Sequence, residues 1–152
     1  MKSNRSPRRR AREFAVQGLY QWLLGTGSEP RDIARQLAEL EGYARGDQPM
    51  LERLWSGTIE KRAELDALLA HYIDRAPDAL SPIEHAILLI GAFELQNMPE
   101  TPYRVVINEA VELAKVYGGI DGHKYVNGVL DKLATRLRGP EIEAGRRQAA
   151  SD

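Results

Sequence analysis

Residues 81–97, SPIEHAILLIGAFELQN, decide the fold of this chain. Ser81 and Pro82 form a helix start, because the hydroxyl can cap the helix and proline lacks only an N–H group that has no helical partner there. Apolar side chains then surround the helix axis almost completely, with Glu84 and Glu94 as interruptions. Since a helix that is apolar all round is buried, we expect this segment at the centre of an all-helical fold.

The flanking segments show the amphipathic pattern of helices that pack around such a centre, with apolar residues at i, i+3, i+4 and i+7. No window alternates with period two, so a sheet is not expected. We predict about seven helices in one domain, residues 1–138, followed by a flexible tail at residues 139–152, where the periodicity is lost. The expected helices lie near residues 7–25, 30–41, 82–97, 102–117 and 122–137, residues 42–49 are expected as a loop, and residues 50–73 as one bent helix or two abutting helices.

Length and composition exclude several classes of protein. The 152 residues, 43% of them apolar, are enough for one domain with its own core. The chain has no cysteine, which excludes disulfides, thiolate zinc sites and cysteine nucleophiles. The longest apolar run, residues 86–93, is too short to span a bilayer, and the basic N-terminus lacks the apolar region of a secretory signal. We therefore expect a cytoplasmic protein without a membrane span.

Positive charge is concentrated at the N-terminus. Six of the 21 Lys and Arg residues lie within residues 1–12, where there is no acid, and the remaining 15 face 22 acidic residues. On a helical wheel, Tyr20 shares an edge with Arg9, away from the centre of the apolar stripe. Guanidinium groups and an aromatic face are what single-stranded RNA requires for its phosphates and bases. The alternative is a solubilising basic end with a half-buried tyrosine, and both interpretations stay open.

A second aromatic and basic group occurs in the last predicted helix. Tyr125, Lys132 and Arg136 follow one another at i, i+7 and i+11, with Lys124 on nearly the same side. Asp121 precedes the helix, and a helix N-terminus favours anions through its free N–H groups and dipole. The alternative is that Asp121 only caps the helix and Tyr125 only covers the edge of the core.

A third surface combines acids with apolar residues. Val105, Glu109, Glu112 and Val116 form a stripe opposite the buried face of their helix, and Glu84 and Glu94 interrupt the central helix. Such a surface suits a basic protein partner, although ordinary solvated glutamates would give the same pattern.

The sequence contains no recognisable catalytic motif. The three histidines, His71, His85 and His123, have no metal-ligand spacing, and the chain has no Gly-rich phosphate loop and no nucleophile elbow. We expect no enzyme, no metal site and no cofactor.

Three segments, in this order, resemble the NusB family of bacterial transcription antitermination factors. They are RRRARE, AVQ and LYQW within residues 8–22, VVINEAVELAK at residues 105–115, and HKYVNGVLDK at residues 123–132. The resemblance extends from Arg8 to about Leu137. It implies seven helices in two packed bundles, and a protein that pairs with NusE, the form of a small-subunit ribosomal protein that works in transcription. The pair would bind boxA RNA of nascent transcripts, notably of ribosomal RNA operons, and help RNA polymerase read through terminators.

The resemblance also implies site residues. Pro82 and Gly122 depart from the family pattern, and at Asp78 another acid is common in the family. The RNA-binding positions of the family fall on Arg8, Arg9, Arg10, Arg12, Tyr20, Asp121, Lys124 and Tyr125, and its NusE-facing acids fall on Asp78, Glu84 and Glu109.

Two other hypotheses stay open. Some ribosomal RNA cytosine methyltransferases carry a related RNA-targeting domain, but their methyl-donor site requires a βα domain for which these 152 residues have no room. A purely structural bundle, or a dimer without RNA, would bind no boxA RNA even with NusE. A homodimer formed in the absence of RNA would hide the RNA-binding side.

Overall fold

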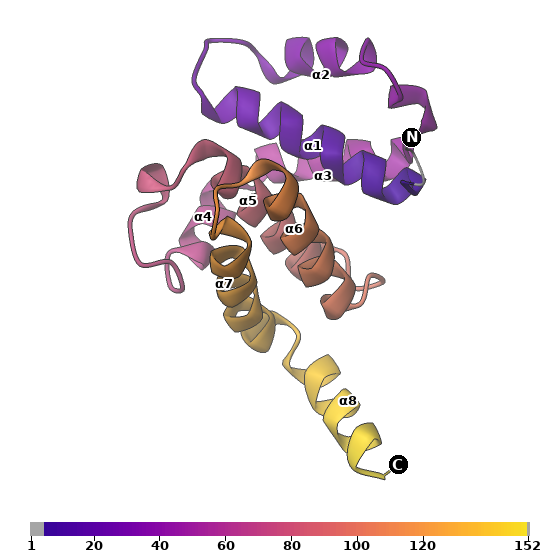
Figure 1. Ribbon diagram of the computed structural model, residues 1–152, viewed down its shortest axis with the longest axis vertical. Coiled ribbons are helices and arrows are strands. Elements are labelled where there is room, and N and C mark those ends of the chain that lie inside the picture. The colour runs from indigo at the N-terminus through magenta and orange to yellow at the C-terminus, as the bar shows by residue number, and fades with distance from the viewer. Residues whose placement is uncertain (1–4, 152) are drawn as a thin grey trace.

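The computed structural model describes residues 5–151, which form α-helices and two short 3-10 turns and contain no strand (Figure 1). Lys2, the first basic residue of the N-terminal cluster, lies outside this range. The helices are α1 (Pro7–Leu23), α2 (Pro30–Ala38), α3 (Gln48–Glu60), α4 (Arg62–Leu69), α5 (Pro82–Asn97), α6 (Tyr103–Tyr117), α7 (Gly122–Leu137) and α8 (Gly139–Ser151), and the turns are η1 (Tyr43–Arg45) and η2 (Pro77–Ala79).

Side-chain caps set the starts of three helices. Ser6 accepts a hydrogen bond from the backbone N–H of Arg9 at 3.1 Å, and Ser81 caps α5 in the same way. Asp47 caps α3, so this helix begins inside the segment expected as a loop. At Lys61 the backbone leaves the helical region, which separates α3 from α4. Of the two expectations for residues 50–73, two abutting helices is therefore correct.

Helix α5 lies at the centre, as predicted, and packs against α1, α3, α4, α6 and α7. Residues 85–95 are buried without interruption. Close approach to this helix requires glycine: a Cβ atom at Gly57 of α3 would lie 2.4 Å from the ring of Phe93. Because α5 contacts helices on both sides, the buried side chains form one continuous core, and the expected division into two bundles is wrong.

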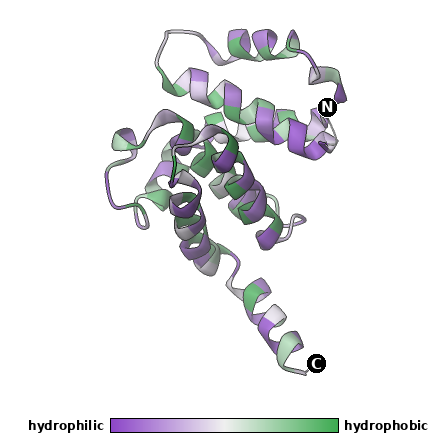
Figure 2. Cartoon of the chain, viewed as in Figure 1, coloured by the Kyte–Doolittle hydropathy of each residue, from purple (hydrophilic) through white to green (hydrophobic). Residues whose placement is uncertain are grey.

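The count of seven helices is also wrong, because residues 139–151 form an eighth. Helix α8 has no buried residue and projects from the rest of the molecule (Figure 1). Its mixed colouring in Figure 2 shows why no apolar stripe predicted it. Whether this segment is flexible stays a prediction. None of the helices in residues 5–151 has the length and apolar content that crossing a membrane requires.

Candidate RNA and partner interface

The N-terminal arginines separate into an exposed pair and a buried pair. Arg8 is exposed, and one of its guanidinium nitrogens lies 3.4 Å from the hydroxyl of Thr101. Arg9 donates two hydrogen bonds to the carboxylate of Glu109 on α6, at 3.0 and 2.7 Å. These two bonds, and the positive charge behind them, hold the pKa of Glu109 below its ordinary value. Arg9 is thus half exposed and already paired.

Arg10 and Arg12 point into the molecule. The guanidinium of Arg10 lies under the η1 turn, close to Gly42, where a Cβ atom would be 2.8 Å from it. Arg12 donates two 2.8 Å hydrogen bonds to Glu94 of α5, and both side chains are at most 5% exposed. The prediction that these two arginines bind RNA stays untested, but their observed partners give them a structural role.

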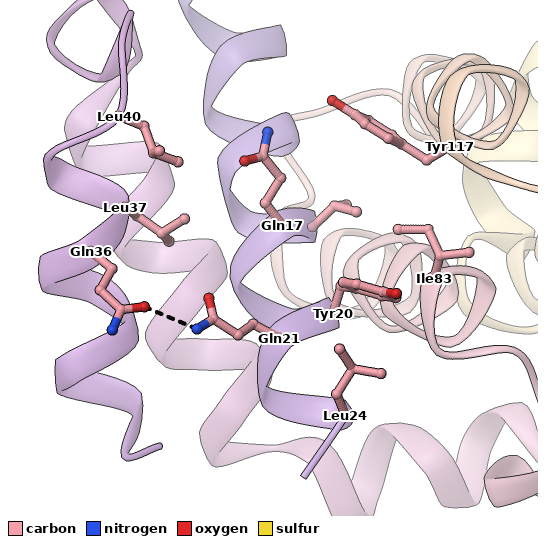
Figure 3. Close-up of a pocket in the computed structure, with 10 residues that line it drawn as sticks. Gln17, Tyr20, Gln21, Leu24, Gln36, Leu37, Leu40, Ile83 and Tyr117 are labelled. Carbon is pink, nitrogen blue, oxygen red and sulfur yellow. Dashed lines mark hydrogen bonds between the residues drawn. The ribbon is translucent and has the colours of Figure 1, made fainter. Parts of the chain in front are cut away.

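Tyr20 lines a cleft of about 570 Å³ between α1, α2 and the α5–α6 side of the molecule. Tyr20 is 39% exposed. Figure 3 shows Ile83 and the ring of Tyr117 on one side of this cleft and Gln17 on the α1 side. The sequence prediction missed Gln17 and Tyr117, because Gln17 lies beside the apolar stripe of α1, Tyr117 continues the apolar stripe of α6, and neither indicates the other. Tyr20 and Arg9 share an edge of α1 as predicted. Arg9 does not line the cleft of Tyr20, however, but two other surface hollows.

The residues predicted at the last helix lie at the start of α7. Asp121 occupies the N-cap position without a side-chain cap, and its carboxylate lies 3.5 Å from the ammonium group of Lys124. The hydroxyl of Tyr125 donates to Asp74 at 3.1 Å, and the guanidinium of Arg75 stands 5.0 Å above its ring. Hydrogen bonding to Arg75, and secondarily to Tyr125, lowers the pKa of Asp74 to about 2.

The first turn of α5 lies between the tyrosine cleft and the residues at the start of α7. Ile83 faces the cleft of Tyr20, and the neighbouring Glu84 contacts Gly122 at the start of α7, where a Cβ atom would be 2.7 Å from the carboxylate. A Cβ atom at position 122 would require the end of the Glu84 side chain to move, so glycine permits this close contact. Asp78 is exposed on η2, before α5.

The remaining ionisable candidates have structural partners. His85 is buried, and its Nε2 lies 2.7 Å from Asp66 of α4. Within residues 5–151, no group of three His, Asp or Glu side chains could hold a metal ion. The features that can bind a ligand are thus the exposed arginines, the tyrosine cleft and the start of α7.

Comparison with known proteins gives consistent matches. The chain matches the NusB family over residues 9–135. The transcription antitermination protein NusB of Paraburkholderia phymatum is 54% identical over 144 residues, which are 95% of this chain and 99% of the relative. The protein of the same name from Aromatoleum aromaticum is 51% identical, with the same coverage.

Solved structures agree in fold. NusB of T. maritima has a TM-score of 0.75 and 29% identity, over 89% of this chain and 93% of that chain. A chain in the crystal structure of the antitermination factors NusB and NusE with dsRNA has a TM-score of 0.73 over 84% of this chain and 96% of that chain, and at 24% identity it shows the fold alone. The family match and the identity of the relatives over nearly the whole length show that this chain belongs to the NusB family.

Proposed function

We propose that this protein is a transcription antitermination factor that acts with NusE as an RNA-binding adaptor. The pair holds boxA RNA of nascent transcripts, notably of ribosomal RNA operons, and promotes read-through by RNA polymerase. The protein turns over no substrate, uses no cofactor and works in the cytoplasm, where the transcripts are made. Its membership of the NusB family and the shared name of its relatives support this proposal.

The tyrosine cleft is the observation that carries the proposal. Two rings, Tyr20 from α1 and Tyr117 from α6, line one hollow together with the amide of Gln17. An unstacked base gains about 1–3 kcal/mol from stacking on an aromatic side chain. Amide groups beside it can hydrogen-bond the edge of the base, which is how single-stranded RNA is read. The cleft therefore has the chemistry of a base pocket.

Charged residues outside the cleft supply the other roles. Arg8, Arg9 and Lys124 are exposed or half exposed and would contact phosphates. The ring of Tyr125 would stack on a base once Arg75 moves from its face, and this guanidinium would then be free for a phosphate. The acids of the partner surface, Asp78, Glu84 and Glu109, would face basic residues of NusE.

The direct test is a titration of labelled boxA RNA and of a scrambled RNA with the full chain, each with and without NusE, followed by fluorescence anisotropy. We expect tighter binding of boxA than of the scrambled RNA, and a further gain for boxA when NusE is present. Equal affinity for both RNAs in the presence of NusE would contradict the proposed function.

A further inference from the structure

The ion pair between Arg9 and Glu109 joins the proposed RNA surface to the proposed partner surface. Arg9 lies on the basic edge of α1, and Glu109 lies in the acidic and apolar stripe of α6. Two hydrogen bonds, at 2.7 and 3.0 Å, connect them. Each residue is thus the counter-charge of the other while neither ligand is bound.

This pair can be opened, unlike the ion pair beside it. The side chain of Arg9 is 40% exposed and that of Glu109 17%, whereas Arg12 is only 5% exposed. Arg12 lies 3.7 Å from Glu109, but its two hydrogen bonds to Glu94 keep it in place. If another cation pairs with Glu109, Arg9 is therefore the side chain that is released.

A released Arg9 has no uncommitted acid close by among the residues that the structure describes. Besides Glu109, the carboxylates whose charge acts on Arg9 are Glu112 and Glu13. Glu13 already accepts a hydrogen bond from Arg5 at 2.8 Å, and Glu112 accepts one from Lys115 at 3.2 Å. A phosphate of bound RNA is then the strongest available acceptor for this guanidinium.

We propose that Glu109 is a positioning residue that couples partner binding to RNA binding. In the free chain it holds Arg9 away from phosphate, and a basic residue of NusE that pairs with Glu109 releases Arg9 to the RNA. This inference rests on the proposed function. Coupling of two binding equilibria is reciprocal, so RNA that captures Arg9 raises the affinity of Glu109 for the partner by the same factor.

The two binding events are coupled because Arg9 and Glu109 each require a counter-charge. When one ligand binds alone, it breaks the pair, and the other side chain loses the two hydrogen bonds that joined them. When both ligands bind, Arg9 and Glu109 each have a new counter-charge. Positive cooperativity follows even without a change of backbone conformation.

The test measures boxA affinity without NusE as a function of salt for Glu109→Gln, Arg9→Ala and the double variant. We expect Glu109→Gln to bind RNA about fivefold more tightly than the wild type, within the usual range of such couplings. The slope of log affinity against log salt should be steeper by about 0.7, because one more phosphate is neutralised on single-stranded RNA. The gain in affinity on adding NusE should decrease by the same factor.

The matched control is Glu143→Gln on α8, which removes the same charge from a carboxylate that also faces an arginine, Arg146 at 3.8 Å. The proposal is overturned if Glu109→Gln and Glu143→Gln have the same affinity and slope. It is also overturned if the effect of Glu109→Gln persists in the Arg9→Ala background, since the effect would then be long-range charge alone. Failure of the proposed function is seen separately, as equal binding of boxA and scrambled RNA, because phosphate contacts of Arg9 do not depend on sequence.

Discussion

Arg12 and Glu94 form the buried ion pair that ties the first helix to the central one. A buried charge is stable only with its partner, and removing one partner typically costs about 3–5 kcal/mol. We therefore expect Glu94→Gln to lower the free energy of unfolding by about that amount, measured by urea denaturation followed by circular dichroism. The exposed pair Asp32–Arg35 is the control, and Asp32→Asn should change the free energy by less than about 1 kcal/mol. An equally small change in both variants would contradict the structural role of the buried pair.

Glu109 provides a prediction on pH. Its pKa in the folded chain lies below the ordinary value of 4.5, chiefly because Arg9 donates hydrogen bonds to it. A depressed folded pKa gives stability that is present above the unfolded pKa and is lost as the pH falls through the folded one. Wild type should therefore exceed Glu109→Gln in unfolding free energy at pH 7 by no more than about 1 kcal/mol, since the pair is partly exposed. Urea denaturation below pH 4.5 should show this difference shrinking, and a constant difference would contradict the assignment.

The sequence predicted the exposure of a side chain where this depends only on the residue's own helix. The wheel placed Tyr20 off the buried stripe, and the structure leaves its ring partly exposed. Arg12 belongs to the same cluster as Arg8, but its partner Glu94 is 82 residues away along the chain. No local sequence pattern indicates such a pairing. The ion pair of Arg9 with Glu109, two residues predicted for different ligands, was missed for the same reason.

The junction of α7 and α8 caps two other helices. Arg138 is buried and donates hydrogen bonds to the carbonyl oxygens of Glu94, Leu95 and Met98 at the end of α5. Glu141 accepts a hydrogen bond from Arg138 at 2.6 Å and another from a backbone N–H at the start of α6, which has no side-chain cap of its own. The start of α8 thus holds the turn between α5 and α6.

This arrangement predicts a local effect of substitution at Glu141. A helix cap contributes about 1 kcal/mol, so Glu141→Ala, which removes the acceptor, should destabilise the fold by roughly this amount. Hydrogen exchange at the backbone amide of Tyr103 should become faster, because this amide donates to Glu141. Glu143→Ala, two residues further along α8, should change neither quantity. Unchanged exchange at Tyr103 in Glu141→Ala would contradict the capping role.

Whether a helix can be predicted from the sequence depends on whether local or distant contacts stabilise it. Helices with an apolar stripe and a Ser-Pro start, such as α1 and α5, were predicted because both signals are local. Helix α8 has neither signal, since its tertiary anchors are Arg138 and Glu141 and the partly buried Ile142. A helix held by contacts with distant backbone groups leaves no periodicity in its own sequence.

Helix α5 joins the helices into one core and also separates the two parts of the candidate site. Its first turn presents Ile83 to the tyrosine cleft and Glu84 to the start of α7. The resemblance to the NusB family predicted residues from both ends of the chain, but not that Tyr117 would share the cleft of Tyr20. Which side chains share a surface depends on packing angles that no single helix encodes.

The most direct test of the composite RNA site is the salt dependence of boxA binding in the presence of NusE. With the partner present, Arg8 and Arg9 should both contact phosphates, so Arg8→Ala/Arg9→Ala should flatten the slope by about 1.4, about 0.7 for each lost contact. The control is Arg146→Ala/Arg147→Ala on α8, which removes the same charge from exposed arginines outside the site and should leave the slope unchanged. Equal slopes for the two double variants would contradict the assignment of Arg8 and Arg9 to the RNA site.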